Sequence, residues 1–337
     1  MAGIKMFGIS SFDVRMISYD PGDVAVIHPE AYPIDVDAFL TTLGWSNSAD
    51  EPIRMQHFYE DQSLPDRLPQ VSSPHPFFVS PGHQCSPQAV LRLLKHFTTD
   101  EREREKLGEF EISSPEVAVL SEFRSARVPR EHIFELFPPL RPREFSIASA
   151  SLAHPHEVQL CVAVVDYKSE LRVRRPRRAE LRIEITKGLP ALPPDSTTPV
   201  VCVGRGTGVA PARAMLEARV HLGLRDNTLF FGHRAPGKDD HYLREWAALA
   251  EAGNLTYHTS CRGFAGRPRR HAADLRARSH WQLIHDRSTW MYISGCPRVC
   301  ELHWWTSLRE EWELGEAEAR AYVAWLERER LFEECRS

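Results

Sequence analysis

The spacing of apolar and polar residues changes about halfway along the chain. In the first half, four segments show the alternation or β-branched content typical of strands, at residues 12–28, 144–149, 158–167 and 181–185. Three others carry the spacing of helices, at residues 34–43, 87–110 and 131–137. Because the helical segments interrupt the strands, the pattern predicts a β domain with a helical insert at about residues 34–138.

A different order begins after the proline-rich segment 189–199. Runs of strand length then alternate with segments of helical spacing, at residues 199–204, 211–223, 228–234, 242–253, 254–260 and 290–295. Such alternation is typical of βαβ units around a parallel sheet. The predicted fold class is therefore α/β plus β, with a β domain at residues 1–190 and a parallel-sheet α/β domain at residues 196–337.

Composition and charge narrow the class of protein. Of the 337 residues, 42% are hydrophobic and 26% are charged, and no apolar run reaches the length of about 18 residues that a membrane helix needs. The net charge of -4 gives no reason to expect a nucleic acid partner. No secretion signal opens the sequence, so we expect a cytoplasmic protein. The seven cysteines form no C-x-x-C pair, so we expect neither a disulfide framework nor a bound metal.

A glycine-rich turn follows the first strand of the second domain. Residues 203–211 read VGRGTGVAP, which runs from an apolar strand through glycines into a helix with proline in its first turn. Glycines let the backbone approach a pyrophosphate, and a helix N-terminus offers free N–H groups. The spacing is neither that of the common dinucleotide fingerprint nor that of a P-loop. From these residues alone, a tight turn without a ligand is an equally good interpretation.

A second candidate site lies in the first domain, at residues 141–149, RPREFSIAS. An arginine, an aromatic residue and a hydroxyl residue stand close together there, at Arg143, Phe145 and Ser146. Arginine can neutralise a cofactor phosphate, an aromatic side chain can cover a flat ring system, and serine can hydrogen-bond a ring nitrogen. The combination suits a flavin, although a surface arginine beside a core phenylalanine would give the same sequence.

In this order, the two segments resemble the ferredoxin–NADP reductase-like module of diflavin reductases, most closely the NADPH-dependent diflavin oxidoreductases of cytosolic iron–sulfur assembly. The resemblance runs from about Asp13 to the C-terminus and includes PGDVAVIHP, LTTLGWSN, FRSARVPREHIFELFPPLRPREFSIAS, VQLCVAVVDYK, LPPDSTTPVVCVG and GTGVAP. It implies an FAD-binding antiparallel β-barrel, an NADPH-binding domain and hydride transfer from NADPH to FAD. Because the chain begins inside the reductase part, electrons would pass to a separate acceptor, an FMN domain or an anamorsin-type iron–sulfur protein.

The resemblance also implies roles for individual residues. Those expected at FAD are Arg143, Glu144, Phe145, Ser146 and Tyr167. Those expected at NADPH are Gly206, Thr207, Gly208, Cys261 and Arg262, the last of which would meet the 2′-phosphate. The residues expected near the transferred hydride are Ser146, His233 and Glu334.

Several positions differ from the family pattern. After Tyr167 the family has a Gly-x-Cys-Ser/Thr loop that holds the FAD pyrophosphate, whereas residues 170–183 here read ELRVRRPRRAELRI. Their arginines either bind phosphate in place of the loop or form a solvated surface. His233 and Arg336 replace a cysteine and an aromatic residue of the family. The alternatives to an active enzyme are therefore a catalytically impaired binding or scaffold protein of the same fold and, from the glycine turn alone, an unrelated nucleotide-binding regulator.

Overall fold

The computed structural model describes the chain in segments separated by gaps. These are residues 3–10, 18–28, 33–49, 51, 91, 94–109, 123–129, 132, 142–164, 182–189, 192–233, 240–261, 288–295 and 315–334. Tyr167, Arg262 and Arg336 lie outside the described residues, as do nearly all of the predicted helix at 131–137 and the basic segment up to residue 181.

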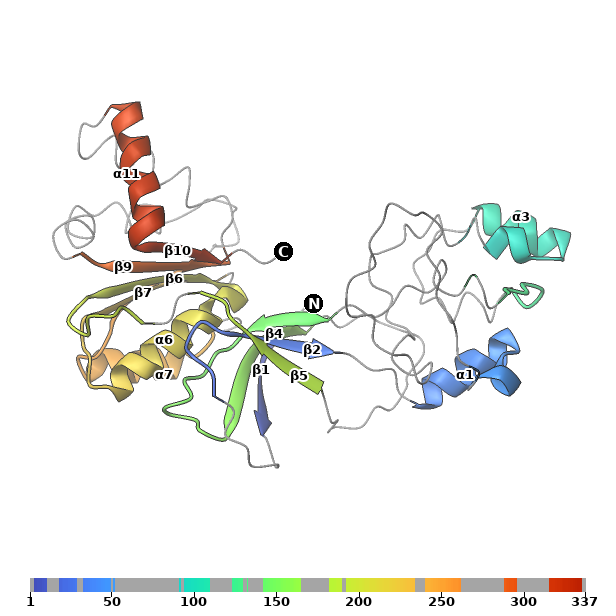
Figure 1. Ribbon diagram of the computed structural model, residues 1–337, viewed down its shortest axis with the longest axis horizontal. Helices are drawn as coiled ribbons and strands as arrows, with labels where there is room; N and C mark the ends of the chain where they lie inside the picture. The colour runs from blue at the N-terminus through green and yellow to red at the C-terminus, as the bar shows by residue number, and fades with distance from the viewer. Residues whose placement is uncertain are drawn as a thin grey trace. The chain divides into compact units, whose positions relative to one another are not determined.

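A parallel sheet of five strands forms the second half of the chain, as the alternating pattern predicted (Figure 1). In sheet order, the strands are β10 (Leu331–Glu334), β9 (Trp290–Ser294), β6 (Val200–Arg205), β7 (Asn227–His233) and β8 (Thr256–Cys261). Each strand is parallel to its neighbours. Parallel sheets are buried on both faces, which explains the nearly continuous apolar runs of the central strands.

Helices cover both faces of this sheet (Figure 1). α6 (Val209–His221) and α7 (Leu243–Glu251) lie on one face, and α11 (Glu316–Glu329) lies on the other. The first two helices confirm the helices predicted from the sequence. α11 begins with a capping interaction, because Glu318 Oε2 accepts a hydrogen bond of 3.1 Å from the Gly315 N–H.

The apolar core of this part lies between the sheet and helices α6 and α7. Trp246 of α7 is fully buried, and its indole Nε1 donates to the His241 carbonyl at 2.9 Å. Around it, the buried side chains of the cluster include Cys202, Val209, Leu216, Leu229 and Phe231. Burial of each large apolar side chain stabilises the fold by about 1.5–3 kcal/mol, so the two helices are held on the sheet mainly by this cluster.

Cys202 should resist alkylation in the native protein. The residue is fully buried in β6, and this burial raises the pKa of its thiol to about 12. The proton is held more tightly in the native state, so the thiol contributes stability below about pH 9 that is lost as the pH rises towards 12. At pH 8.5 only about one thiol in 3,000 is a thiolate, the reactive form.

The measurement is iodoacetamide labelling with mass spectrometry of the peptide that contains Cys202. We expect labelling only after denaturant has unfolded the protein. Labelling of native protein at the rate of a small-molecule thiol would contradict this packing of β6.

Antiparallel pairing appears in the first half of the chain. β1 (Gly3–Ser10) pairs with β4 (Glu157–Val164) antiparallel along its whole length. β3 (Arg143–Ser146), β2 (Val24–His28) and β5 (Arg182–Thr186) form a three-stranded sheet in that order. β1 was not predicted, because its two glycines weaken the local strand signal and its pairing with β4 decides its structure.

The chain forms two compact units. One comprises Met1–Val26, Glu144–Lys168 and Glu184–Ser337, and the other comprises Ile27–Arg143 and Ser169–Ile183. The first unit therefore contains the parallel sheet and most of the strands of the first half of the chain. The described residues of the sites below lie within it, apart from Arg143, which ends a segment of the second unit.

The second unit contains the helices α1 (Pro33–Leu43) and α3 (Glu101–Glu109) and the short helix η1 (Ser46–Ser48). Two of these three, α1 and α3, coincide with predicted helical segments, whereas η1 was not predicted. Asp100 caps α3, because its Oδ1 accepts hydrogen bonds from the backbone N–H groups of Arg102 at 2.9 Å and Glu103 at 3.0 Å. An aspartate at this position is a typical helix start.

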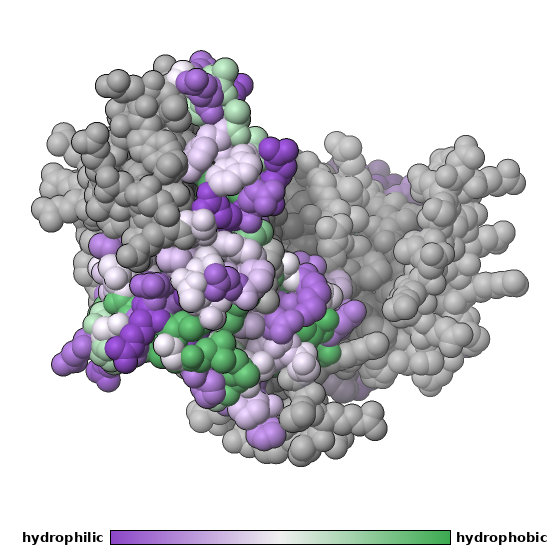
Figure 2. Space-filling model, turned by 60° about the vertical axis from the view of Figure 1, so that its left-hand side comes forward, coloured by the Kyte–Doolittle hydropathy of each residue, from purple (hydrophilic) through white to green (hydrophobic). Residues whose placement is uncertain are grey.

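The described surface mixes hydrophilic and hydrophobic residues on the face that Figure 2 shows. Over all the described residues, and not only on this face, the exposed large apolar side chains are Ile34, Leu152, Leu222, Leu243 and Trp325. Scattered apolar side chains of this kind are ordinary on a protein surface. Within the described segments, no helix has the length and apolar character needed to cross a membrane.

Candidate cofactor site

The glycine-rich turn lies at the carboxyl end of β6, in the centre of the parallel sheet. Gly206–Gly208 form a single 3-10 turn, and α6 begins directly afterwards at Val209. Gly206 has a φ of +57°, which favours glycine. Gly208 is the N-cap of α6 and offers no side-chain acceptor to the first turn of the helix. Open α/β sheets bind ligands at this edge, where helix N–H groups point at the ligand.

Close backbone packing explains the glycine at position 208. A Cβ atom there would lie 2.6 Å from the Ser294 carbonyl oxygen and 2.9 Å from the Gly295 Cα. Gly295 in turn has a φ of +79°, and a Cβ there would lie 2.8 Å from the Arg205 carbonyl oxygen. The ends of β6 and β9 therefore touch through backbone alone. At Gly206, in contrast, a Cβ would meet nothing within 4 Å, so the turn keeps open space there and fits the dinucleotide expected at this edge.

Two of the predicted catalytic residues meet although they are 188 positions apart. Ser146 Oγ, at the end of β3, donates a hydrogen bond of 2.9 Å to Glu334 Oε2, at the end of β10. Glu334 is 7% exposed, and its backbone carbonyl accepts from the Gly295 N–H at 3.2 Å. Because Gly295 also packs against the turn at Gly208, the serine, the glutamate and the turn form one continuous set of contacts.

The strand that carries Ser146 is anchored by a buried aspartate. The Asp23 carbonyl accepts a hydrogen bond of 3.0 Å from the Ile147 N–H, directly after Ser146. The Asp23 carboxylate, which is 2% exposed as a residue, accepts from the Asp20 N–H at 2.9 Å and from Lys187 Nζ at 3.0 Å. Lys187 Nζ also donates to Asp20 Oδ2 at 2.7 Å, and its hydrogen bonds to the carboxylates of Asp20, first, and Asp23, second, raise the pKa of Lys187. The anchored turn fixes the position of the Ser146 backbone.

The other residues expected at FAD stand earlier on β3. Arg143 and Glu144 are exposed, whereas Phe145 and Ser146 are half-buried. A cation, a ring and a hydroxyl thus follow one another along a strand whose last residue reaches Glu334. This donor set fits a flavin with a phosphate tail, since a guanidinium binds phosphate and a hydroxyl hydrogen-bonds a ring nitrogen.

His233 ends the next strand of the parallel sheet. Its Nδ1 lies 2.7 Å from Asp240 Oδ1, and its Nε2 lies 3.1 Å from Thr259 Oγ1. The residue before it pairs with Arg205, and His233 itself pairs with Cys261 in the sheet register. The histidine and Cys261 therefore share the edge of the sheet that carries the glycine turn.

Sequence reasoning missed the residues that hold the predicted ones in place. Ser294 and Gly295 pack on the turn, and Asp240 contacts the His233 ring. The apolar run WMYIS followed by glycine was a usable signal for the first pair, since glycine after a buried strand marks a close backbone approach. No local pattern pointed to Asp240.

The chain combines antiparallel strands with a five-strand parallel sheet, and a glycine turn lies at the carboxyl ends of the parallel strands. This arrangement is consistent with the fold of ferredoxin–NADP reductase-like flavoproteins. The chain belongs to the family described as FAD binding domain, whose model matches residues 7–176. This match covers the second half of β1 and the whole of β2, β3 and β4, of which β3 carries Ser146.

Relatives that are similar over most of the chain are named NADPH-dependent diflavin oxidoreductase 1. That of Cryptococcus neoformans is 32% identical over 355 residues, which cover 94% of this chain and 57% of the relative. Those of Bos taurus and Xenopus laevis are 31% and 29% identical and cover 98% and 95% of this chain, and 63% and 61% of the relatives. The chain thus spans about three fifths of the length of these relatives.

These comparisons confirm the predicted resemblance to an FAD- and NADPH-dependent reductase module. The structure confirms an antiparallel pair and a parallel sheet as the two kinds of β structure. The role of each site residue stays a prediction.

Proposed function

We propose that the chain is an NADPH-dependent flavin oxidoreductase, the FAD- and NADPH-binding reductase part of a diflavin-type enzyme. The observation that carries the proposal is the hydrogen bond between Ser146 and Glu334. It joins the strand expected at the flavin to the strand that ends beside the glycine turn expected at NADPH. When bound, FAD supplies the acceptor for the hydride of NADPH and the electrons for the next protein.

The residues of the chain would bind and orient the two cofactors. On the flavin side we assign Arg143 to the FAD phosphates, Phe145 to the isoalloxazine face and Ser146 to the ring, with Glu144 and Tyr167 as further contacts. On the nicotinamide side we assign Gly206, Thr207 and Gly208 to the pyrophosphate, and Cys261 and Arg262 to the adenosine end. An arginine that forks around a phosphate would favour NADPH over NADH.

Three residues would act where the hydride moves. Ser146 and Glu334 would share a hydrogen bond next to the reacting rings, and the Glu334 carboxylate would stabilise the positive charge that the nicotinamide ring gains. His233, held by Asp240 and Thr259, would border the nicotinamide pocket. Their common property is a fixed orientation, which reduces the reorganisation needed in the transition state.

We further propose that the antiparallel strands close into a barrel, with an FAD-binding domain at residues 1–190 and an NADP-binding domain at residues 196–337. The electron acceptor would be an FMN domain or an iron–sulfur protein of the anamorsin type, in cytoplasmic iron–sulfur cluster assembly. The names of the relatives support an enzyme of this kind, and the acceptor follows from the resemblance alone.

The test is anaerobic stopped-flow absorbance of the purified chain, reconstituted with FAD and mixed with NADPH or with NADH. We expect bleaching of the flavin band with NADPH and at least about tenfold slower bleaching with NADH, since the 2′-phosphate contact contributes only to the former. Flavin that binds and stays oxidised with both nucleotides would contradict the proposal. That outcome would favour a scaffold protein of the same fold.

A further inference from the structure

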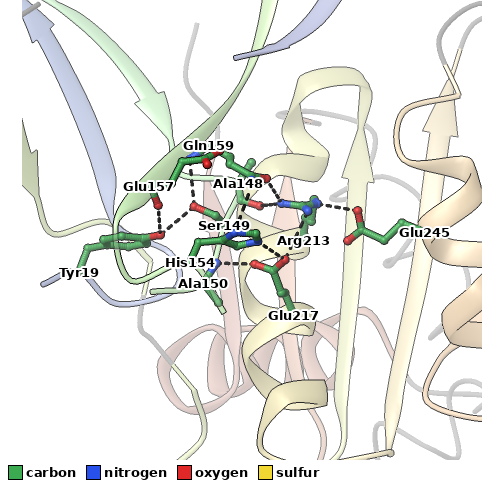
Figure 3. Close-up of polar contacts among 10 residues, drawn as sticks. All are labelled: Tyr19, Ala148, Ser149, Ala150, His154, Glu157, Gln159, Arg213, Glu217 and Glu245. Carbon is green, nitrogen blue, oxygen red and sulfur yellow. Dashed lines mark hydrogen bonds and ion pairs between the residues drawn. The ribbon is translucent and has the colours of Figure 1, made fainter. Parts of the chain in front are cut away.

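A buried arginine joins α6 to the antiparallel part of the first unit (Figure 3). Arg213, in the second turn of α6, is 5% exposed. Its Nη1 donates hydrogen bonds to the Ala148 carbonyl at 2.5 Å and to Gln159 Oε1 at 2.9 Å. Ala148 lies just after β3, and Gln159 belongs to β4. One guanidinium nitrogen therefore bridges both of these segments to the helix.

The same guanidinium is held from its other side by two carboxylates. Its Nε donates to Glu245 Oε2 of α7 at 3.0 Å, and its Nη2 lies 3.3 Å from Glu217 Oε1 of α6. The guanidinium also stacks over the Tyr242 ring, with its carbon 4.7 Å from the ring centroid. Burial raises the pKa of Glu245, and the charge of Arg213 opposes that shift. Arginine can serve all these groups at once because its five donors form a rigid fork.

Glu217 makes a second link between α6 and the segment that follows β3. Its Oε2 accepts a hydrogen bond of 2.6 Å from the Ala150 N–H, and its Oε1 lies 2.9 Å from His154 Nε2. Apolar packing adds to the polar contacts, since Ala210 of α6 packs with Ala148 and Cys161. Arg213 and Glu217, which we call the α6 clamp, thus hold the backbone at two alternate positions of one short segment.

The clamp lies close in sequence to both halves of the candidate site. Ala148 is two residues after Ser146, and Arg213 is in the helix that starts directly after Gly208. Short segments of strand and helix are rigid because their backbones are fixed by hydrogen bonds. A displacement at one end of such a segment therefore also displaces its other end. A shift of the clamp would therefore change the distance between the serine and the glycine turn.

We propose that Arg213 is a positioning residue that sets the separation of the two cofactors by fixing the segment after β3 against α6. The inference rests on the proposed function, since it concerns the distance between a flavin at Ser146 and a nicotinamide at the turn. Arg213 would touch neither cofactor and would act through Ala148 and Glu217.

Arg219 provides a matched control on the same helix. It is 1% exposed, and its guanidinium donates to Asn227 Oδ1 at 2.6 Å and to the Thr198 carbonyl at 3.0 Å. Both acceptors belong to the parallel-sheet part, so Arg219 makes a similar number of buried hydrogen bonds without reaching β3 or β4. Replacing either arginine by lysine keeps the charge and removes the fork.

The experiment compares Arg213→Lys, Arg219→Lys and the unchanged chain, each reconstituted with FAD. Hydrogen–deuterium exchange of the peptides covering residues 147–161 reports whether the clamp holds, and it needs no activity. Anaerobic stopped-flow with increasing NADPH separates the limiting rate of flavin reduction from the Kd of NADPH. Glu217→Gln, which keeps the shape of the side chain, serves as a milder second variant should Arg213→Lys not fold.

We expect Arg213→Lys to speed amide exchange in 147–161 and to lower the limiting reduction rate roughly tenfold, because small misplacements of reacting groups slow transfer strongly. The Kd of NADPH should change less than about threefold, since the turn itself is intact. Arg219→Lys should lower the melting temperature but change neither amide exchange in 147–161 nor the limiting reduction rate. Glu217→Gln should speed this exchange and lower this rate, as Arg213→Lys does.

Unchanged exchange in Arg213→Lys, or an equal loss of rate in Arg219→Lys, would overturn the inference. Faster exchange with an unchanged limiting rate would overturn the positioning role and leave only a structural link. If the unchanged chain binds FAD but is not reduced by NADPH, the proposed function fails by itself, and the exchange data still decide whether the clamp exists.

Discussion

Gly208→Ala should slow NADPH-dependent flavin reduction about 100-fold while leaving the flavin bound. The added Cβ would lie 2.6 Å from the Ser294 carbonyl oxygen, a backbone atom that cannot rotate away. The turn must therefore separate from β9, at a cost of about 1–3 kcal/mol for such overpacking. A displaced turn would no longer present its N–H groups to a pyrophosphate, and a misplacement of about 1 Å can slow a reaction about 100-fold. Stopped-flow reduction and thermal unfolding measure the two effects.

Gly223→Ala is the matched control for this substitution. Gly223 follows the other end of α6 and has a φ of +76°, and a Cβ added there would meet no atom within 4 Å. Alanine there is strained by the left-handed backbone, and we expect it to lower stability by about 1 kcal/mol. Its reduction rate should stay within twofold of that of the unchanged chain. A Gly208→Ala variant that is reduced as fast as Gly223→Ala would argue against a ligand at the turn.

Glu334→Gln should slow flavin reduction by roughly 100-fold, with a smaller change in the apparent affinity for NADPH. The amide keeps the size of the side chain and can still meet the Ser146 hydroxyl, which now donates 2.9 Å to Oε2. The amide lacks the negative charge of the carboxylate. A buried charge interacts more strongly than a charge in water with the positive charge that develops on the nicotinamide ring. The limiting rate in an NADPH titration is the measurement.

Glu333→Gln, on the same strand, is the control for charge alone. Glu333 is exposed and precedes the buried Glu334. Glu333→Gln changes the net charge of the chain by the same amount as Glu334→Gln. Because the Glu333 side chain is exposed, water and salt screen its effect on the candidate site. We expect a rate within twofold of that of the unchanged chain. Equal slowing in both variants would indicate a general electrostatic effect and remove Glu334 from the site.

The parallel part of the fold was predicted well because its signals are local. Strands β6, β7 and β9 contain short apolar runs, and α6 begins after β6 with a distinct change of period. Helix α11 and strand β10 were not predicted, because the sequence LFEE of β10 carries no apolar run. The antiparallel part was harder, because β1 contains two glycines and depends on β4, which lies far away in sequence. Pairing partners at such a separation leave no pattern in either segment alone.

The candidate site was predicted in its parts more than in its assembly. Local motifs located Ser146 and the glycine turn, and the resemblance added Glu334. Their contact depends on the sheet order, which places β10 next to β9 and brings Glu334 beside Gly295. The α6 clamp was not predicted at all, since an arginine inside a helix shows no sign of which acceptors it will meet.

The separation of Ser146 and Glu334 also has a consequence for protein synthesis. At about 5–20 residues per second, the ribosome adds the glutamate roughly 10–40 s after the serine, because 188 positions lie between them. A nascent chain can form the strands that carry Ser146 long before β10 exists. The pair therefore forms only after β10 has been synthesised, and a chain interrupted before β10 would carry the serine without the carboxylate that orients it.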